Sequence, residues 1–342
     1  MINAHLDEDD QLMVDPLFRP VLVSPNKMRF YSGPISGPEY TVTDSDEEGV
    51  FGQILDLLVD GCTPHEIINR IDSKDEDSVL ELIVGLYDAG VITKIESGSS
   101  QPESTQGYLS QLTISNEFGS DDIAESEVLV CSAGFDTKSI ERQLSQTEIE
   151  AVTQIQFTNA GNPELTSFPS PDELATFDVA VLLSRRTDGK VGIELSRRTR
   201  TAGIPLVAGR VDGLDAFIGP VVMPNASPCY NCFQKRLESN ILNDGQYEEY
   251  IKETPRYERG PIVDIFEDFV ASYLSITTIR VLSTGASFLT GASVHTDFLT
   301  TNMVRDDILP VPQCAICGVD TDRNPERQPF LTLDQIEWGE EW

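Results

Sequence analysis

The chain has 342 residues, of which 57 are acidic and 24 are basic, so its formal net charge at pH 7 is −33. The charge is spread along the chain and 39% of residues are hydrophobic, which favours a globular, halophilic protein with a dense carboxylate surface. Binding to nucleic acid would require a basic footprint and is therefore not expected. No run approaches the roughly 18 apolar residues of a membrane span, and no signal-peptide pattern is present, so we expect a cytoplasmic protein without membrane contact.

The length allows two domains, each with its own core. After a polar lead-in at residues 1–16, β-like stretches alternate with Pro-Asn and Gly-Pro turns, and helical periodicity follows. This pattern predicts three strands, three helices and a short last strand, closing near residue 95. The expected ranges are 19–24, 28–32, 40–44, 47–60, 65–71, 74–89 and 91–93.

Two local signals support these helices. Thr63 precedes Pro64, which suits a capping residue followed by the first helical position. In the third helix the apolar residues Val79, Ile83 and Leu86 recur at helical spacing, so they form one stripe along it.

A second domain is expected at residues 126–330. The segment 97–125 before it is rich in Ser, Gln, Gly and acidic residues, so we interpret it as a linker with one candidate strand at 108–114. Strands alternate with helices beyond the linker, which predicts a mostly parallel, Rossmann-like α/β sheet. The expected strands are 127–131, 153–157, 179–183, 205–209 and 288–300, and the expected helices are 137–146, 192–202 and 262–283; the stretch 217–222 leads into the first cysteine pair.

Four cysteines form two Cys-x-x-Cys pairs, Cys229 with Cys232 and Cys314 with Cys317. Thiols at this spacing in tight turns converge on one tetrahedral face, so the two pairs predict a single four-sulfur zinc site. Two unrelated thiol pairs, or a disulfide, are the alternatives. Because all four ligands are sulfur, no position stays open for water or substrate, and we expect the zinc to be structural.

The sequence around these cysteines resembles the ubiquitin-activating E1/ThiF/MoeB superfamily. The resemblance rests on Phe177–Leu182, Ala202–Val207 and Gly219–Pro224, followed by the first cysteine pair, and it covers about residues 126–320. It implies a Rossmann-like sheet with a split four-cysteine zinc site.

Residues 16–96 resemble a PqqD-like recognition element, a small winged-helix fold (βββααα) that binds precursor leader peptides, with the match at Leu58–Ile67. Such an element joined to an E1-like zinc domain is the architecture of cyclodehydratase partner proteins in thiazole/oxazole-modified peptide biosynthesis. The resemblance implies three candidate partners: a leader peptide, a YcaO-type cyclodehydratase and a second copy of the chain.

A leader peptide of this kind would add as a strand to an open sheet edge, with its apolar side chains against the third helix. At least half of the helix stripe must belong to the core. The residues expected to contact the leader are Tyr40, Thr41, Val42 and Thr43 on the strand and Val79, Ile83 and Leu86 on the helix.

An adenylating E1 needs a glycine-rich turn after its first strand and acidic residues after the next two. Here the first strand leads into Ser132–Lys138, which holds one glycine followed by the bulky Phe135. The loops after the second and third strands begin with Gln156–Asn159 and Ser184–Arg186, which contain no acidic residue. These departures predict that no nucleotide is bound and no catalytic residue is present, with a divergent but active site as the alternative.

We therefore hypothesise a non-catalytic scaffold that presents a ribosomal precursor peptide to a YcaO-type cyclodehydratase for azoline- or thioamide-type modification. The alternative is an E1-like adenylyltransferase acting on a ubiquitin-like or sulfur-carrier protein. That role needs a reactive cysteine, whereas Cys62 and Cys131 are expected to be packing residues. A winged-helix DNA reader conflicts with the 20 acidic and 6 basic side chains of residues 1–98.

Overall fold

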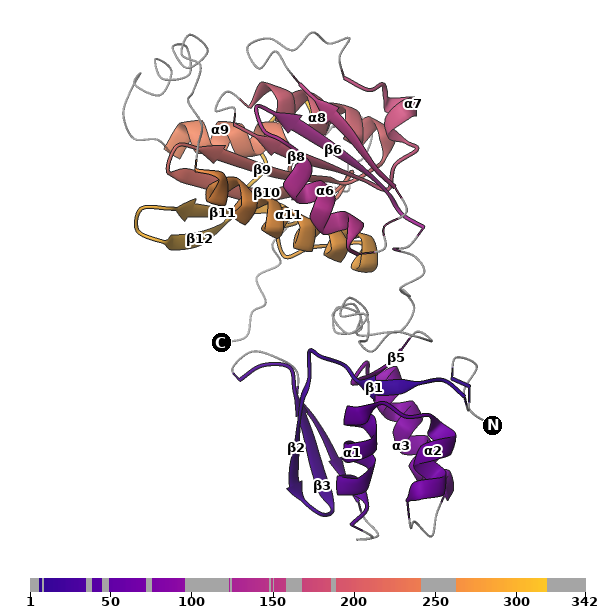
Figure 1. Cartoon of the computed structure of the whole chain (residues 1–342). Coiled ribbons are helices and arrows are strands. Elements are labelled where there is room, and N and C mark those ends of the chain that lie inside the picture. Colours follow the sequence, from indigo (N-terminus) through magenta and orange to yellow (C-terminus); the bar gives the residue numbers. More distant parts are fainter. Residues whose placement is uncertain are drawn as a thin grey trace, which may run out of the picture. The chain divides into compact units, whose positions relative to one another are not determined.

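The computed structural model describes residues 6–7, 9–34, 39–44, 49–71, 76–95, 123, 125–147, 149, 151–157, 168–185, 189–240 and 263–318. The chain divides into two compact units, Met1–Ile123 and Ala124–Trp342 (Figure 1). Helices and strands are mixed throughout, which confirms the α/β class. None of the helices in the described ranges is both long enough and apolar enough to cross a bilayer. The candidate strand at 108–114 lies outside the described residues.

The first unit combines two small antiparallel sheets with three helices. Strands β2, β3 and β4 form one sheet with β3 in the middle, and β1 pairs with β5 in the other. The elements in chain order are β1 (Leu12–Val14), β2 (Arg19–Ser24), β3 (Lys27–Tyr31), β4 (Glu39–Thr43), α1 (Phe51–Asp60), α2 (Pro64–Arg70), α3 (Glu76–Asp88) and β5 (Ile92–Lys94).

The core of the first unit lies between the three-stranded sheet and the helices. Met28 and Phe30 point inward from β3 and are fully buried, as are Ile54 on α1 and Ile83 on α3. Met28 and Phe30 are two positions apart, so they share one face of the sheet and leave the other face outward.

Helix α2 begins as the sequence predicts. The Thr63 hydroxyl accepts the N–H of Glu66 at 3.1 Å, and the Glu66 carboxylate accepts the N–H of Thr63 at 3.1 Å, with Pro64 in the first turn. This reciprocal pair satisfies two of the N–H groups at the helix start and stabilises it by about 1 kcal/mol.

The interpretation of residues 1–16 as a polar lead-in is wrong for strand β1. Leu12 is fully buried, and its backbone exchanges two hydrogen bonds with Cys62, of 2.8 Å and 3.0 Å. Val14 pairs with Ile92 on β5. The two-stranded sheet therefore draws its first strand from upstream of the expected domain start at residue 16.

The second unit is built on a seven-stranded sheet with the order β12-β11-β10-β9-β8-β6-β7. Helices α6 and α11 cover one face, and α8 and α9 cover the other (Figure 1). Its strands are β6 (Glu127–Ala133), β7 (Ala151–Gln156), β8 (Val179–Ser184), β9 (Leu206–Asp212), β10 (Asp215–Val222), β11 (Ala292–Asp297) and β12 (Asn302–Asp307). Its helices are α6 (Lys138–Ser145), α7 (Pro171–Leu174), α8 (Lys190–Ala202), α9 (Tyr230–Asn240) and α11 (Asp264–Thr284).

The sheet is less parallel than the sequence suggested. Strands β7, β6, β8 and β9 run parallel, but β10, β11 and β12 are joined antiparallel to one another and to β9. Asp212 and Asp215 face each other across a two-residue turn that contains Gly213 with a positive φ of 69°. This turn reverses the chain without a crossover helix, so the alternation of strands and helices ends there.

In such a sheet, ligands bind where successive crossovers leave in opposite directions, at the carboxyl ends of the strands. Here β6 lies between β7 and β8, so that point is the gap between the ends of β6 and β8. The residues that meet there are Gly134 and Phe135 after β6 and Arg185 after β8.

Candidate metal centre

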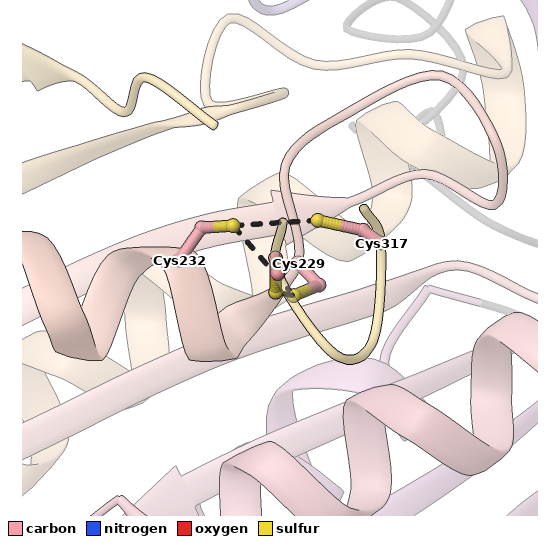
Figure 2. A group of neighbouring side chains, drawn as sticks. Cys229, Cys232 and Cys317 are labelled. Carbon is pink, nitrogen blue, oxygen red and sulfur yellow. Dashed lines mark hydrogen bonds between the residues drawn. The ribbon is translucent and has the colours of Figure 1, made fainter. Parts of the chain in front are cut away.

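The four cysteines of the two Cys-x-x-Cys pairs come together in the second unit. Their sulfur atoms all lie within 4.8 Å of one another, and three of the four residues are buried. The Sγ atoms of Cys229 and Cys314 are 3.6 Å apart, and those of Cys232 and Cys317 are 3.3 Å apart (Figure 2). A disulfide needs sulfurs at about 2.05 Å, and all four are free thiols, so the disulfide alternative is wrong and the site is suited to a metal ion.

The first pair is positioned by the start of α9. Helix α9 packs closely on α8. A Cβ added to Gly192 on α8 would lie only 2.5 Å from the ring of Tyr230 on α9. The buried hydroxyl of Ser196 accepts the N–H of Tyr230 at 3.2 Å. Tyr230 lies between the two cysteines in sequence, so α8 fixes where Cys229 and Cys232 present their thiols.

The second pair lies in a turn that follows β12. The N–H of Gly318 donates to the carbonyl of Cys314 at 2.7 Å and closes the turn around the two thiols. A Cβ at position 318 would lie 2.3 Å from that carbonyl oxygen, so only glycine fits this close approach.

Hydrogen-bond donors favour the thiolate form that a metal requires at two of the four sulfurs, those of Cys232 and Cys314, whereas the hydrogen bond with Cys232 raises the pKa of Cys229. The N–H of Val311 donates to Cys232 Sγ at 3.3 Å, and the side-chain amide of Asn231 donates to Cys314 Sγ at 3.3 Å. Hydrogen bonds from Cys229 and then Cys317, together with Val311, hold the pKa of Cys232 well below its usual value. Burial raises the pKa of Cys314, but the N–H groups of its own turn and Asn231 outweigh burial and lower it.

Cys62 and Cys131 lie outside the cluster. Burial raises the pKa of Cys62 to about 11 and that of Cys131, in the middle of β6, to about 12. Both thiols stay protonated at neutral pH, so they are poor nucleophiles and poor metal ligands. This agrees with their interpretation as packing residues.

At the point of the sheet between the ends of β6 and β8, the Arg185 side chain packs against the turn after β6. A Cβ added to Gly134 would lie 3.3 Å from Cβ and 3.5 Å from Cδ of Arg185, so the Arg185 side chain lies directly against this turn. The Arg185 guanidinium is 4.7 Å from the centre of the Phe135 ring. It also donates to the carboxylate of Glu267 on α11, and both side chains are mostly buried.

The sequence indicated the loss of the glycine turn but gave no sign of this internal ion pair. Burial raises the pKa of Glu267, and the neighbouring Arg185 charge offsets only part of that effect. Glu267 lies 82 residues after Arg185, and nothing in the local pattern of either segment relates the two.

A buried arginine was also missed. Arg210, at the end region of β9, is 2% exposed and donates to the Gln234 side chain on α9 at 3.0 Å. Its guanidinium is 4.7 Å from the centre of the Phe217 ring. This contact joins the sheet to α9 beside the first cysteine pair. Arg210 therefore helps to hold that helix in place.

The strand residues expected to contact a peptide lie on β4, at one edge of the three-stranded sheet. Tyr40 and Val42 point toward the core and are half-buried, whereas Thr41 and Thr43 are exposed. The backbone edge of β4 faces away from β3.

The three helix residues need a correction, because they lie in the core. Val79 is 5% exposed, Ile83 is 0% exposed and Leu86 is 4% exposed, and all three pack with the buried residues of the first unit. The α3 stripe has the period of a core-facing helix, and the unit's own side chains fill the pockets expected beside it.

No protein family and no curated protein matches this sequence. Its fold is shared with several solved structures. One is a heterocyclase in complex with substrate and cofactor, with a TM-score of 0.66 and 14% identity over 90% of this chain and 39% of that one. Another is the heterocyclase TruD, with a TM-score of 0.62 and 15% identity over 90% of this chain and 43% of that one.

A second group of similar structures is matched over nearly the whole of their own length. E. coli MccB has a TM-score of 0.55 and 10% identity, over 91% of this chain and 97% of that one. The microcin C7 biosynthetic enzyme MccB in complex with N-formylated MccA has a TM-score of 0.56 and 11% identity, over 90% of this chain and 100% of that one. This chain therefore spans about two fifths of the heterocyclases it matches and nearly all of MccB.

Proposed function

We propose that this chain is a non-catalytic peptide-binding scaffold that presents a ribosomal precursor peptide to a modifying enzyme. In this proposal the first unit is a winged-helix-like recognition element, and the second is a Rossmann-like E1/ThiF-type domain that docks a YcaO-type cyclodehydratase. The fold shared with two heterocyclases and with an MccB–MccA complex supports a role in peptide modification. In this proposal the partner carries out the modification, and this chain presents the peptide to it.

The observation that carries the non-catalytic role is the Arg185–Glu267 ion pair. A nucleotide would bring its phosphates to the turn after β6, where backbone N–H groups can approach them. The Arg185 side chain occupies that approach, and its charge is already paired with Glu267. Opening the site would expose Phe135 and separate a mostly buried ion pair, so nucleotide binding is disfavoured.

The two edges of the three-stranded sheet support different roles. β2 contains Pro20, which lacks an N–H, and its register with β3 shifts between Leu22 and Ser24. Prolines and bulges are the features that protect an edge strand against pairing. β4 contains no proline, and its five residues pair with β3 in an unbroken register, so β4 is the better edge for an added peptide strand.

A peptide on β4 would find its side-chain contacts close to the strand rather than on α3. Residues of the peptide that face inward would meet Tyr40 and Val42, which are half-buried at the rim of the core. The core positions Val79, Ile83 and Leu86 could contribute only by supporting those two side chains from behind.

Zinc is the metal we propose for the cysteine cluster. Tetrahedral zinc with bonds of about 2.3 Å places neighbouring sulfurs roughly 3.8 Å apart, close to the 3.9 Å between Cys229 and Cys232 and the 3.6 Å between Cys229 and Cys314. With four sulfur ligands the ion has no open position, so its proposed role is to hold α9 to the turn after β12.

A second candidate is an E1-like adenylyltransferase, which is favoured by the match to MccB over its whole length. One of the matching MccB structures contains AMPCPP together with MccA. Calorimetry with Mg-ATP, and exchange of pyrophosphate into ATP in the presence of a candidate peptide, test this alternative. A micromolar heat signature or measurable exchange would replace the scaffold proposal.

The scaffold proposal is tested on the full chain with the leader segment of a candidate ribosomal precursor peptide. Backbone N–H groups of a strand alternate between its two neighbours, so one of Thr41→Pro and Val42→Pro removes only an outward-facing donor. We expect at least one variant that melts like the wild type but binds the labelled leader much more weakly. Tight leader binding by two well-folded variants would exclude pairing at β4.

A further inference from the structure

One segment of the first unit lacks acidic residues. Across the chain 57 of 342 residues are acidic, or one in six, yet residues 16–38 contain none in 23 consecutive positions. The same segment carries Arg19, Lys27 and Arg29, which are half of the six basic residues of positions 1–98. In a protein with a net charge of −33, such a local excess of positive charge needs an explanation.

Burial does not explain why residues 16–38 lack acidic side chains. A second long stretch without acids, 269–296, contains the buried face of α11, where carboxylates would be costly. Strand β2, in contrast, is largely exposed, with 38% of Val21, 44% of Leu22 and 51% of Val23 accessible to solvent. Three consecutive exposed apolar residues beside three cations are typical of a surface that binds a partner.

The register places most of these groups on one face of the sheet. Arg19 pairs with Tyr31, and Val21 pairs with Arg29, so their side chains point away from the core on which Met28 and Phe30 lie. Arg29 is held in place by the Tyr31 hydroxyl at 3.1 Å and by Glu39 at 3.4 Å.

The two outer cations of this face are Arg19 and Lys27, which can pair with a bound carboxylate. Within the described residues, Arg19 and Lys27 form no ion pair with an acidic side chain. Arg19 is exposed and Lys27 is half-buried. A bound carboxylate could therefore pair with them without displacing an internal partner.

We propose that this outer face, formed by Arg19, Val21, Val23, Lys27 and Arg29, is a docking surface for an acidic, partly apolar segment of a partner protein. Pairing of this face with the same face of a second copy does not fit, because it would bring cations together. Nucleic acid is disfavoured because the rest of the chain is strongly negative. The surface lies on the face of the sheet, away from the free backbone of β4, so it does not depend on the peptide-presenting function.

Both components of the surface are needed for useful affinity. An exposed ion pair contributes only about 0–1 kcal/mol, and salt weakens it further. The exposed valines add apolar area that salt does not screen. We therefore expect an acidic polymer with aromatic side chains to bind more tightly than one with the same charge and no apolar groups.

The test uses the full chain and three defined probes: a random copolymer of glutamate and tyrosine, polyglutamate, and the RNA homopolymer poly(U). Binding is measured by biolayer interferometry at about 0.1 M salt, where electrostatic contacts are only partly screened. The copolymer should bind best. Failure of the copolymer to bind, equal binding of polyglutamate, or tighter binding of poly(U) would each overturn the proposal.

Charge-reversal variants locate the binding. Arg19→Glu/Lys27→Glu should weaken copolymer binding by about tenfold. The control Arg70→Glu/Lys138→Glu makes the same change in net charge at side chains that are 61% and 83% exposed, and should weaken it by no more than about twofold. Equal losses in both pairs would mean that net charge alone governs binding, which contradicts the proposal.

A matched pair of valines tests the apolar component. Val23 on β2 and Val59 on α1 are each 51% exposed, so Val23→Ser and Val59→Ser remove similar areas. Only Val23→Ser should weaken copolymer binding. The β4 proline variant that melts like the wild type should leave it unchanged, which separates this surface from the β4 edge; a loss in that variant, or an equal loss in both serine variants, would refute the location.

Discussion

The guanidinium of Arg185, which follows β8, donates to the carboxylate of Glu267 on α11, 82 residues further along the chain. The side chains are only 21% and 16% exposed, so the pair is held mostly out of water. It closes the end of the sheet over Phe135 and joins the strand layer to the long helix. Its energetic role can be measured directly.

A double-mutant cycle on this pair should show coupling. Arg185→Ala and Glu267→Ala should each lower the free energy of unfolding by about 1–3 kcal/mol, because each leaves a mostly buried charge without its partner. The double variant should lose about 1 kcal/mol less than the sum of the two. Urea unfolding of the four proteins gives the values, and strict additivity would show that the pair is no more than a surface contact.

Cys314→Ser should release the bound metal. A hydroxyl is a poor substitute for a thiolate ligand, and metal binding is coupled to folding, so metal content should fall from about one per chain toward zero and the second unit should melt earlier. Elemental analysis and calorimetry measure the two effects. Cys131→Ser is the matched control, since it changes a buried thiol outside the cluster and should keep the metal; full occupancy in Cys314→Ser would disprove the assignment.

Gly318→Ala should also disturb the metal centre, although position 318 is not a ligand. The added Cβ would lie 2.3 Å from the Cys314 carbonyl oxygen, so the turn that presents Cys314 and Cys317 must open. Faster metal loss to a chelator is the expected readout. In Gly85→Ala the new methyl has no atom within 4 Å and lies in α3, so that control should stabilise the protein by about 0.5–1 kcal/mol; equal chelation rates would contradict the role of the turn.

Low pH should weaken the hydrogen bonds that Glu194 on α8 accepts from Arg197 and Arg198. Burial raises the pKa of Glu194, but hydrogen bonds from Arg197 and Arg198 outweigh it and hold this pKa below its usual value. The stabilisation is therefore present above the unfolded pKa of about 4.3 and is lost as pH falls through the lower folded value. NMR titration of the side-chain carboxyl measures that pKa; it should rise in Arg197→Ala, and an unchanged value would show that Arg197 contributes nothing.

These contacts with Glu194 show how the basic pair Arg197 and Arg198 is used in this acidic chain. Arg198 donates to the carbonyls of Phe168 and Pro169 at 2.9 Å each, as well as to Glu194. Arg197 and Arg198 thus balance a local carboxylate, that of Glu194. Arg185 also pairs with a carboxylate, but from a distant segment.

Local signals in the sequence were sufficient where the structure depends on neighbouring residues. The cysteine spacing predicts convergent thiols because two turns set their geometry, and Thr63 followed by Pro64 predicts a helix start from neighbouring residues alone. Strand β1 was missed because Leu12 and Val14 are embedded in an acidic segment whose average is polar. Apolar periodicity finds a core face but does not tell a core from a groove, and Val79, Ile83 and Leu86 are core.

Contacts between distant segments left no such signal. The antiparallel half of the large sheet follows from the tight turn at Gly213, after which β10 pairs back on β9 instead of crossing over. The Arg185–Glu267 pair depends on where α11 lies on the sheet, which neither segment encodes alone.

The split of the cysteine pairs also sets a time order for biogenesis. Cys229 and Cys232 leave the ribosome 85 residues ahead of Cys314 and Cys317, and every described helix and strand of the second unit precedes the last ligand. A nascent chain thus contains at most two of the four cysteines until the sheet and α11 have been synthesised. Metal capture is consequently a late step, and a chain interrupted before Cys314 would carry an open thiol pair that quality-control proteases and oxidants can reach.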